Sequence, residues 1–299
     1  MPSTPRQTSP RKTPAKTLAK AAGKDPSKGT GDTVDLSARE EHEVGELSPP
    51  RAAVVFETIR REGQGELERA VFSLFASGLA AGLAMGMSLA GVGMISAVLP
   101  DAPWKPLATS AGYTLGFLIV VLGRQQLFTE NTLTAILPLL DNPDKLKTLL
   151  KVGRLWGVVL IANLLGATIF AFAAAHTPIF SEAVRTAFAH IGHEAAAPPF
   201  GTIVLRGIVA GWLIALMVWL LPGADELRLF VILIITYAVG LGSFSHIIAG
   251  SVEVLYLVAI GDLSWWQYLS GYLLPVFIGN VAGGVSLVAV LNYAQVVAD

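Results

Sequence analysis

The chain has 299 residues, of which 53% are hydrophobic and 14% are charged, and its formal net charge at pH 7 is -1. With a mean hydropathy of +0.59, this composition favours one polytopic membrane domain over the two soluble domains that the length alone would indicate. The sequence contains no cysteine, which excludes disulfides, thiolate metal sites and cysteine nucleophiles.

Charge is concentrated in the N-terminal part of the chain. Residues 1–69 carry 12 Lys/Arg and 11 Asp/Glu, whereas the following 230 residues carry only 9 and 11. Residues 1–51 are rich in Lys, Pro, Ser, Thr and Gly and lack the apolar core of a signal peptide, so we predict a disordered cytoplasmic tail. Residues 52–69 alternate apolar and charged side chains, which predicts an amphipathic helix at the membrane surface.

Six hydrophobic segments follow within residues 70–299, the predicted channel domain. They cover residues 71–98, 107–140, 152–175, 202–221, 229–260 and 267–296. Each is long enough to cross a bilayer core of about 30 Å. The predicted fold class is therefore an all-α polytopic membrane protein with six transmembrane helices.

The second and fifth segments are interrupted by polar residues and glycine, at residues 127–132 and 243–251. Backbone that leaves the helix at membrane depth loses its hydrogen bonds, which is tolerated only beside protein or a polar cavity. Because paired breaks in the two halves of a transporter usually mark its binding site, the sequence predicts a pore at these breaks.

Basic residues predict the orientation of the chain in the membrane. They cluster before the first segment and after the second, at Arg60, Arg61, Arg69, Lys145, Lys147, Lys151 and Arg154. The connections on the other side offer mainly Lys105 and Arg185. By the positive-inside rule, both termini are cytoplasmic.

The two halves of the channel domain share sequence motifs. Asn-x-x-Gly begins at Asn163 in the third segment and at Asn280 in the sixth, 117 residues later. Gly-x-x-x-Gly begins at Gly78 in the first segment and at Gly207 in the fourth, 129 residues later. Three spans per half reverse the chain direction, so the predicted repeat is inverted and three plus three.

Thr129 and His246, one at each break, share the offset of 117 residues and are expected to meet near the membrane centre. His246 is the only histidine inside a predicted span, and an ionisable side chain there marks a pathway by default. A neutral histidine that only bonds backbone carbonyls freed by the break is the alternative. Thr129 either orients a substrate oxygen or caps a helix.

Four other charged residues fall in or beside the spans: Arg124, Glu130, Arg206 and Glu253. They are expected to compensate one another as charge partners. Glu253 follows His246 by seven residues, about two helical turns, so a proton relay between them is one possibility and a structural pair with an arginine or another subunit is the other.

Several segments together resemble the formate/nitrite transporter family over residues 68–296. The matching segments are Leu127-Phe128-Thr129, the motifs at Asn163 and Asn280, residues 207–212 with Val218-Trp219, the His246 break, and Pro275-Val276-Phe277-Ile278-Gly279-Asn280. The resemblance implies an aquaporin-like fold, a homopentamer in the bacterial inner membrane, and one pore per protomer for small monovalent anions such as formate or nitrite.

The resemblance also implies which residues line the path. It places the pore histidine at His246 and the loop threonine at Thr129, with apolar constrictions at Leu127 and Phe117 and at Tyr113 and Val239. The predicted substrate pathway comprises His246, Thr129, Leu127, Phe128, Phe117, Tyr113, Val239 and Ser245.

Three positions depart from formate-type members of the family. Those members usually carry glutamate, asparagine and asparagine where this chain has Ser245, Gly211 and Gly250. The chain therefore resembles a divergent branch, and the resemblance does not specify the anion.

The main functional prediction is a channel in which a weak-acid anion is protonated through His246 and crosses the apolar constrictions as a neutral acid. Two alternatives remain: an aquaporin-like pore for neutral solutes, and a non-conducting or regulatory membrane protein of the same fold. We predict no enzymatic activity, no cofactor, no metal and no nucleic-acid partner; the expected partners are a small anion or its acid, lipid and further copies of the chain.

Overall fold

The computed structural model describes residues 36–48 and 50–298, and every regular element in those residues is a helix. The chain divides into two compact units, with the boundary after residue 48. In the first unit, α1 (Ala38–Leu47) begins with a capping box between Ser37 and Glu40. Part of the predicted tail is thus helical, because local capping bonds stabilise α1. Residues 1–35 lie outside the described residues.

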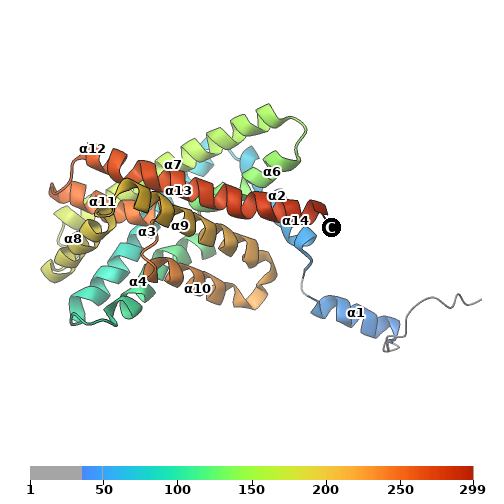
Figure 1. The fold of residues 1–299 in the computed structure, drawn as a ribbon, viewed down its shortest axis with the longest axis horizontal. Coiled ribbons are helices and arrows are strands. Elements are labelled where there is room, and N and C mark those ends of the chain that lie inside the picture. The colour runs from blue at the N-terminus through green and yellow to red at the C-terminus, as the bar shows by residue number, and fades with distance from the viewer. Residues whose placement is uncertain (1–35, 49, 299) are drawn as a thin grey trace, which may run out of the picture. The chain divides into compact units, whose positions relative to one another are not determined.

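The second unit is a bundle of helices around one core (Figure 1). Its elements are α2 (Ala52–Glu68), α3 (Val71–Val98), α4 (Lys105–Leu122), α5 (Phe128–Thr134), α6 (Ile136–Asp141), α7 (Lys145–His176), α8 (Glu182–Ala196), α9 (Phe200–Leu220), η1 (Leu221–Gly223), η2 (Asp225–Leu227), α10 (Arg228–Leu241), α11 (Ala249–Ile260), α12 (Trp265–Gln267), η3 (Tyr268–Leu273), α13 (Leu274–Gly284), η4 (Val285–Val290) and α14 (Leu291–Ala298).

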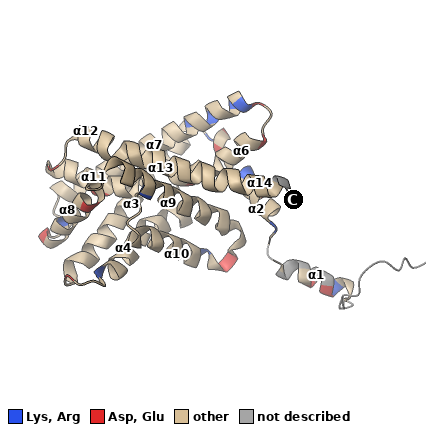
Figure 2. Cartoon of the chain, in the orientation of Figure 1, with Lys and Arg blue, Asp and Glu red and all other residues tan. Residues whose placement is uncertain are grey.

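Five helical segments of the described chain are long and apolar enough to cross a membrane: Val71–Val98, Lys105–Leu122, Lys145–His176, Phe200–Gly223 and Trp265–Val296. The predicted fifth segment is split into α10, of 14 residues, and α11, of 12 residues, and neither is long enough alone. The predicted second segment is split into α4, α5 and α6. Both predicted interruptions are thus confirmed. Most charged residues lie at the ends of the bundle and in its connections (Figure 2).

The two breaks have the same backbone geometry. At each, a glycine ends the preceding helix, and the next residue has positive φ: 49° at Arg124 and 48° at Ser243. Positive φ costs a residue with a side chain about 1 kcal/mol or more, so surrounding contacts must hold both breaks in place.

Asn163 on α7 holds the first break. Its Oδ1 accepts the N–H of Phe128 at 2.9 Å, and its Nδ2 donates to the carbonyls of Gly78 at 2.7 Å and Gln126 at 2.8 Å. One buried amide therefore satisfies backbone groups of the break and of α3, as membrane-depth backbone requires.

Asn280 on α13 holds the second break in the same way. Its Oδ1 accepts the N–H of Ile247 at 2.9 Å, and its Nδ2 donates to the carbonyls of Gly207 at 2.9 Å and Ser245 at 2.8 Å. The two halves repeat the same three bonds, which confirms the internal repeat.

These bonds also correct the predicted correspondence between the breaks. Gln126 and Phe128 occupy the places of Ser245 and Ile247, so the residue equivalent to His246 is Leu127, at an offset of 119 residues. The predicted equivalence of Thr129 and His246 is wrong. The first half has two more residues than the second between its break and its asparagine, which shifts the register.

Close helix contacts complete each half. A Cβ at Gly82 on α3 would lie 2.1 Å from the carbonyl oxygen of Asn163, and a Cβ at Gly211 on α9 would lie 2.3 Å from that of Asn280. Neither separation is compatible with a side chain. The departure at Gly211 therefore has a packing reason, because α9 and α13 approach each other backbone to backbone there.

Gly82→Ala is expected to lower the free energy of unfolding by about 1–3 kcal/mol, because α3 and α7 must move apart to admit the methyl group. Thermal unfolding of the full chain in detergent measures the effect. Gly157→Ala, on α7, is the matched control, since a Cβ there meets nothing within 4 Å. Equal melting temperatures for the two variants would contradict the close contact.

Helix α2 packs against other helices of the second unit. Its apolar face, including Ile59 and Leu67, is buried, and a Cβ at Gly63 would lie 1.9 Å from the carbonyl oxygen of Thr134. Phe56 contacts Tyr293 of α14, with ring centroids 5.7 Å apart. Residues 52–68 are thus helical, and the apolar side of this helix meets protein, because α5, α6 and α14 offer an apolar surface of their own.

The polar face of α2 carries ion pairs. The guanidinium groups of Arg60 and Arg61 donate to the Glu57 carboxylate and lower the pKa of Glu57 to about 2. An ion pair with Lys151 of α7 likewise lowers the pKa of Glu68. The side chain of Glu57 is 37% exposed and that of Glu68 is 57% exposed, so water screens both pairs and each contributes little to stability.

Candidate functional site

Thr129 and His246 form a hydrogen-bonded pair in the core. Thr129 lies in the first turn of α5, and His246 lies in the break before α11. Thr129 Oγ1 and His246 Nε2 are 2.8 Å apart, and the two residues are 0% and 1% exposed. The prediction that these residues approach each other is confirmed, although they are not equivalent positions.

The hydrogen bonds of Nδ1, the second ring nitrogen of His246, indicate which nitrogen carries the proton. His246 Nδ1 accepts the backbone N–H groups of Ile248 at 3.3 Å and Ala249 at 3.2 Å, at the start of α11. A nitrogen that accepts these bonds carries no hydrogen, so the neutral ring has its proton on Nε2. Nε2 therefore donates to Thr129 Oγ1, and the Thr129 hydroxyl proton is free for another acceptor.

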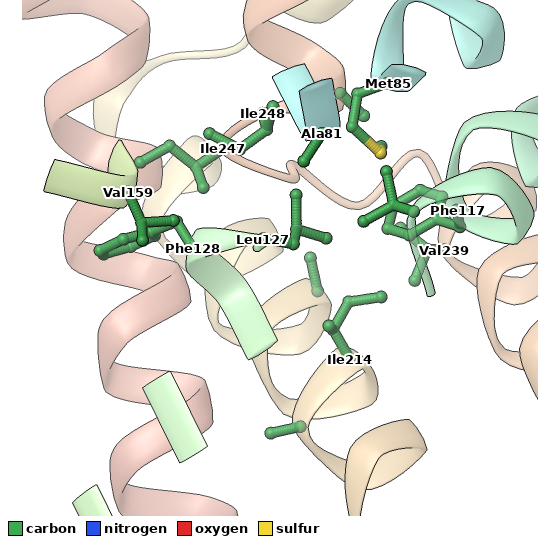
Figure 3. Close-up of a cluster of buried hydrophobic side chains, with 14 of the residues drawn as sticks. Ala81, Met85, Phe117, Leu127, Phe128, Val159, Ile214, Val239, Ile247 and Ile248 are labelled. Atoms are coloured by element: carbon green, nitrogen blue, oxygen red, sulfur yellow. The ribbon is translucent and has the colours of Figure 1, made fainter. Parts of the chain in front are cut away.

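An apolar layer surrounds this pair. The ring of Phe117 meets the His246 ring edge to face at a centroid distance of 4.9 Å, and Tyr113 packs on Phe117 at 5.5 Å. Phe117, Leu127 and Val239 are each 0% exposed and belong to one cluster of buried apolar side chains (Figure 3). Such a layer is a desolvation barrier to an ion.

A first cavity of about 570 Å³ is lined by residues of α2, the first break and the end of α9. Its charged and amide lining residues are Glu62, Glu66, Arg69, Arg124, Gln125, Gln126, Glu130, Asn131 and Arg228. Two ion pairs form among these residues: Arg69 with Glu66 at 2.9 Å, and Arg124 with Glu62 at 3.9 Å. The cavity is thus polar, and α2 forms one of its walls.

A second cavity of about 540 Å³ is lined by residues of α4, α8, α9, α10, the second break, α11 and η3. Four predicted pathway residues line it: Tyr113, Val239, Ser245 and His246. Thr129, Leu127 and Phe117 line neither cavity. All three are fully buried: Leu127 and Phe117 belong to the apolar cluster, and Thr129 bonds to Nε2 of His246.

Phe128 is placed differently from the other predicted pathway residues. Its ring packs against Trp156 at 5.7 Å and Phe277 at 5.6 Å and lines neither cavity. It therefore supports the first break from α7 and α13, next to the bond between its own N–H and Asn163.

The predicted charge partners do not pair with one another in the described chain. Arg124 pairs instead with Glu62 on α2. Glu130 lines the first cavity, and its buried Oε1 accepts no hydrogen bond from any described residue. Glu253 and Arg206 both line the second cavity without forming an ion pair there. The expected pairing of these four residues is therefore not found among the described residues, although Arg124 and Glu130 line one cavity and Arg206 and Glu253 line the other.

Sequence reasoning missed the relation between Gly250 and Tyr272. A Cβ at Gly250 would lie 1.7 Å from the Tyr272 hydroxyl. This hydroxyl therefore fills the space that a larger side chain at position 250 would need, beside the second cavity. Tyr272 is 2% exposed and lines that cavity. No pattern in the sequence links residue 272 to residue 250.

The described residues contain no group of three or more His, Asp or Glu side chains placed to hold a metal ion. The chemistry that this site offers is hydrogen bonding by Nε2 of His246 and the hydroxyl of Thr129.

Comparison with known proteins places the chain among membrane transporters. The sequence model of the formate/nitrite transporter family matches residues 53–294. The inner membrane protein YfdC of Escherichia coli K12 is 43% identical over 251 residues, covering 83% of this chain and 80% of YfdC. The formate channel BtFdhC of Bacillus thuringiensis is 26% identical, covering 66% of this chain and 76% of BtFdhC.

Two solved structures share the fold. A pentameric formate channel with formate bound aligns with a TM-score of 0.66 and 21% identity, covering 75% of this chain and 97% of that one. An ion channel of the same family aligns with a TM-score of 0.67 and 18% identity, covering 81% and 98%.

Proposed function

Because the chain belongs to the formate/nitrite transporter family, we propose that it is a channel for small monovalent weak-acid anions of the formate/nitrite class. The proposed protein is a homopentamer in a bacterial inner membrane with both termini cytoplasmic. An inner-membrane relative and a pentameric formate channel of the same fold support this assembly and location.

One observation carries the proposal: the Thr129–His246 pair is buried among apolar side chains, His246 lines the second cavity, and Glu130, next to Thr129, lines the first. The proposed path runs from the first cavity past Leu127, Phe117 and this pair into the second. An ion in the apolar layer around this pair loses hydration worth several kcal/mol, whereas the neutral acid largely avoids this loss. Protonation beside the layer therefore makes passage possible.

His246 is the proposed proton relay. The ring first takes a proton from water in the second cavity, which His246 lines. The resulting imidazolium then transfers a proton to the anion: the Nε2–H bond breaks as an O–H bond forms, and a neutral ring remains. Nδ1 is occupied by the N–H groups of Ile248 and Ala249, so a proton enters there only after those two bonds open. The Thr129 hydroxyl orients the substrate oxygen toward Nε2.

The full-length protein in proteoliposomes is expected to accelerate the fall of internal pH on addition of formate, nitrite, acetate or hydrosulfide at mildly acidic pH. Empty liposomes give the baseline, because neutral acids also leak through lipid. The same preparation is expected to contain five copies per particle in native mass spectrometry.

Flux equal to the baseline for every anion would reject the channel and favour the non-conducting alternative. Swelling with neutral solutes, without anion-dependent acidification, would instead favour an aquaporin-like pore. A stable monomer or dimer would reject the proposed assembly.

A further inference from the structure

The internal repeat makes Ser77 and Arg206 equivalent. Each immediately precedes the glycine, Gly78 or Gly207, whose carbonyl accepts a hydrogen bond from the asparagine of its half. Both residues lie on the helix that packs against the asparagine-bearing helix, and both face the break of their own half. The two positions nevertheless carry side chains with opposite hydrogen-bonding character.

In the first half, Ser77 satisfies the break. Its Oγ accepts the backbone N–H of Gln126 at 3.0 Å. Gln126 is therefore satisfied on both sides, since its carbonyl accepts from Asn163 at 2.8 Å. No further ligand is needed at this point of the first break.

In the second half, the corresponding acceptor is missing. Ser245 takes the place of Gln126, and its carbonyl accepts from Asn280, but its N–H has no acceptor among the described residues. A guanidinium has only donors, so Arg206 cannot replace the serine oxygen. Both Arg206 and Ser245 line the second cavity, and Arg206 forms no hydrogen bond or ion pair with any described residue.

We propose that Arg206 and the N–H of Ser245 form an anion-binding site in the second cavity, beside His246. This inference rests on the proposed function and adds the residue that concentrates the anion before protonation. A guanidinium binds carboxylate or nitrite oxygens through two parallel bonds, and a free backbone N–H at a helix break adds a third donor. The occupant is a monovalent oxyanion with two adjacent oxygens.

Two carboxylates, those of Glu194 and Glu253, line the same cavity and could neutralise the charge of Arg206 if they paired with it. Glu194 lies 3.7 Å from His190 and is 70% exposed, so water and histidine are its neighbours. Glu253 lines the cavity without an ion pair to Arg206. The guanidinium is therefore not neutralised by either carboxylate and remains available to an anion.

Saturation-transfer NMR on the full-length protein in detergent, with formate as the probe, tests the site without requiring flux. Arg206→Ser is expected to weaken formate binding by about tenfold or more, because a charge-assisted pair is lost and the serine can accept the Ser245 N–H as Ser77 does for Gln126. Arg206→Lys is expected to retain most of the affinity. Arg206→Gln repeats the test should the serine variant fold poorly.

Arg185→Ser is the matched control, since it removes one positive charge from α8 without touching either cavity. Equal formate affinity in wild type, Arg206→Ser and Arg206→Gln would overturn the site, as would equal losses in Arg185→Ser and Arg206→Ser. Binding that depends on Arg206 without flux in proteoliposomes would uphold the site and reject the channel. Anion flux in proteoliposomes, together with formate binding that is unchanged by substitution of Arg206, would uphold the channel and reject the site.

Discussion

His246→Asn is expected to abolish the acceleration of weak-acid uptake at mildly acidic pH, a loss of about 100-fold or more. Asparagine keeps an oxygen near the position of Nδ1, which accepts the N–H groups of Ile248 and Ala249, so the start of α11 is preserved. It is too short to reach Thr129 Oγ1 and has no proton to exchange at neutral pH. Internal pH in proteoliposomes, followed after formate addition, measures the loss.

Thr129→Ser is the matched control for His246→Asn, because it retains the hydroxyl that lies 2.8 Å from Nε2. Its flux is expected to stay within about threefold of wild type, since the bond to His246 is preserved. Glu253→Gln distinguishes a proton relay through Glu253 and His246 from transfer by His246 alone. If both residues form the relay, the Glu253→Gln variant is expected to lose as much flux as His246→Asn; if His246 acts alone, its loss is expected to be smaller. Unchanged flux in His246→Asn would leave a channel but remove histidine from its chemistry.

Asn163→Leu is expected to destabilise the protein by about 2 kcal/mol or more, the second large effect. The change removes three hydrogen bonds at once and leaves the N–H of Phe128 and the carbonyls of Gly78 and Gln126 without partners. A single bond between membrane helices contributes about 0.6 kcal/mol on average, but buried backbone groups at a helix break find no substitute partner. Thermal unfolding in detergent measures the loss.

Asn292→Leu is the matched control, because the buried Nδ2 of Asn292 has no hydrogen-bond partner among the described residues. Replacing it is expected to cost little or to stabilise the protein, since no satisfied group is disrupted. Asn280→Leu is expected to match Asn163→Leu, because it loses the equivalent three bonds. A melting temperature for Asn163→Leu as high as that of Asn292→Leu would refute the role of the asparagines.

Much of the fold was accessible from local patterns in the sequence. Long apolar runs and the two polar breaks predicted the membrane domain and its interrupted segments, because hydropathy acts residue by residue. The asparagine motifs predicted the repeat, and the structure adds the reason, which is that each amide satisfies one broken backbone. His246 was identifiable because an imidazole within an apolar segment is costly and rare.

The register of the two halves depended on long-range contacts. The shared offset of 117 residues predicted that Thr129 meets His246, and they do meet, but the hydrogen bonds of Asn163 and Asn280 pair His246 with Leu127. A two-residue insertion is invisible to short motifs, because they contain no information about which backbone groups they satisfy.

What the sequence alone determined is the class of protein and the identity of its central histidine and threonine, since both follow from composition and from the local environment of single residues. Only the tertiary structure decided which nitrogen of His246 carries the proton, that α2 walls one cavity, that Tyr272 fills the space beside Gly250, and that Arg206 stands where Ser77 stands in the other half. Each of these depends on contacts between segments far apart in the chain, and such contacts arise from how helices pack.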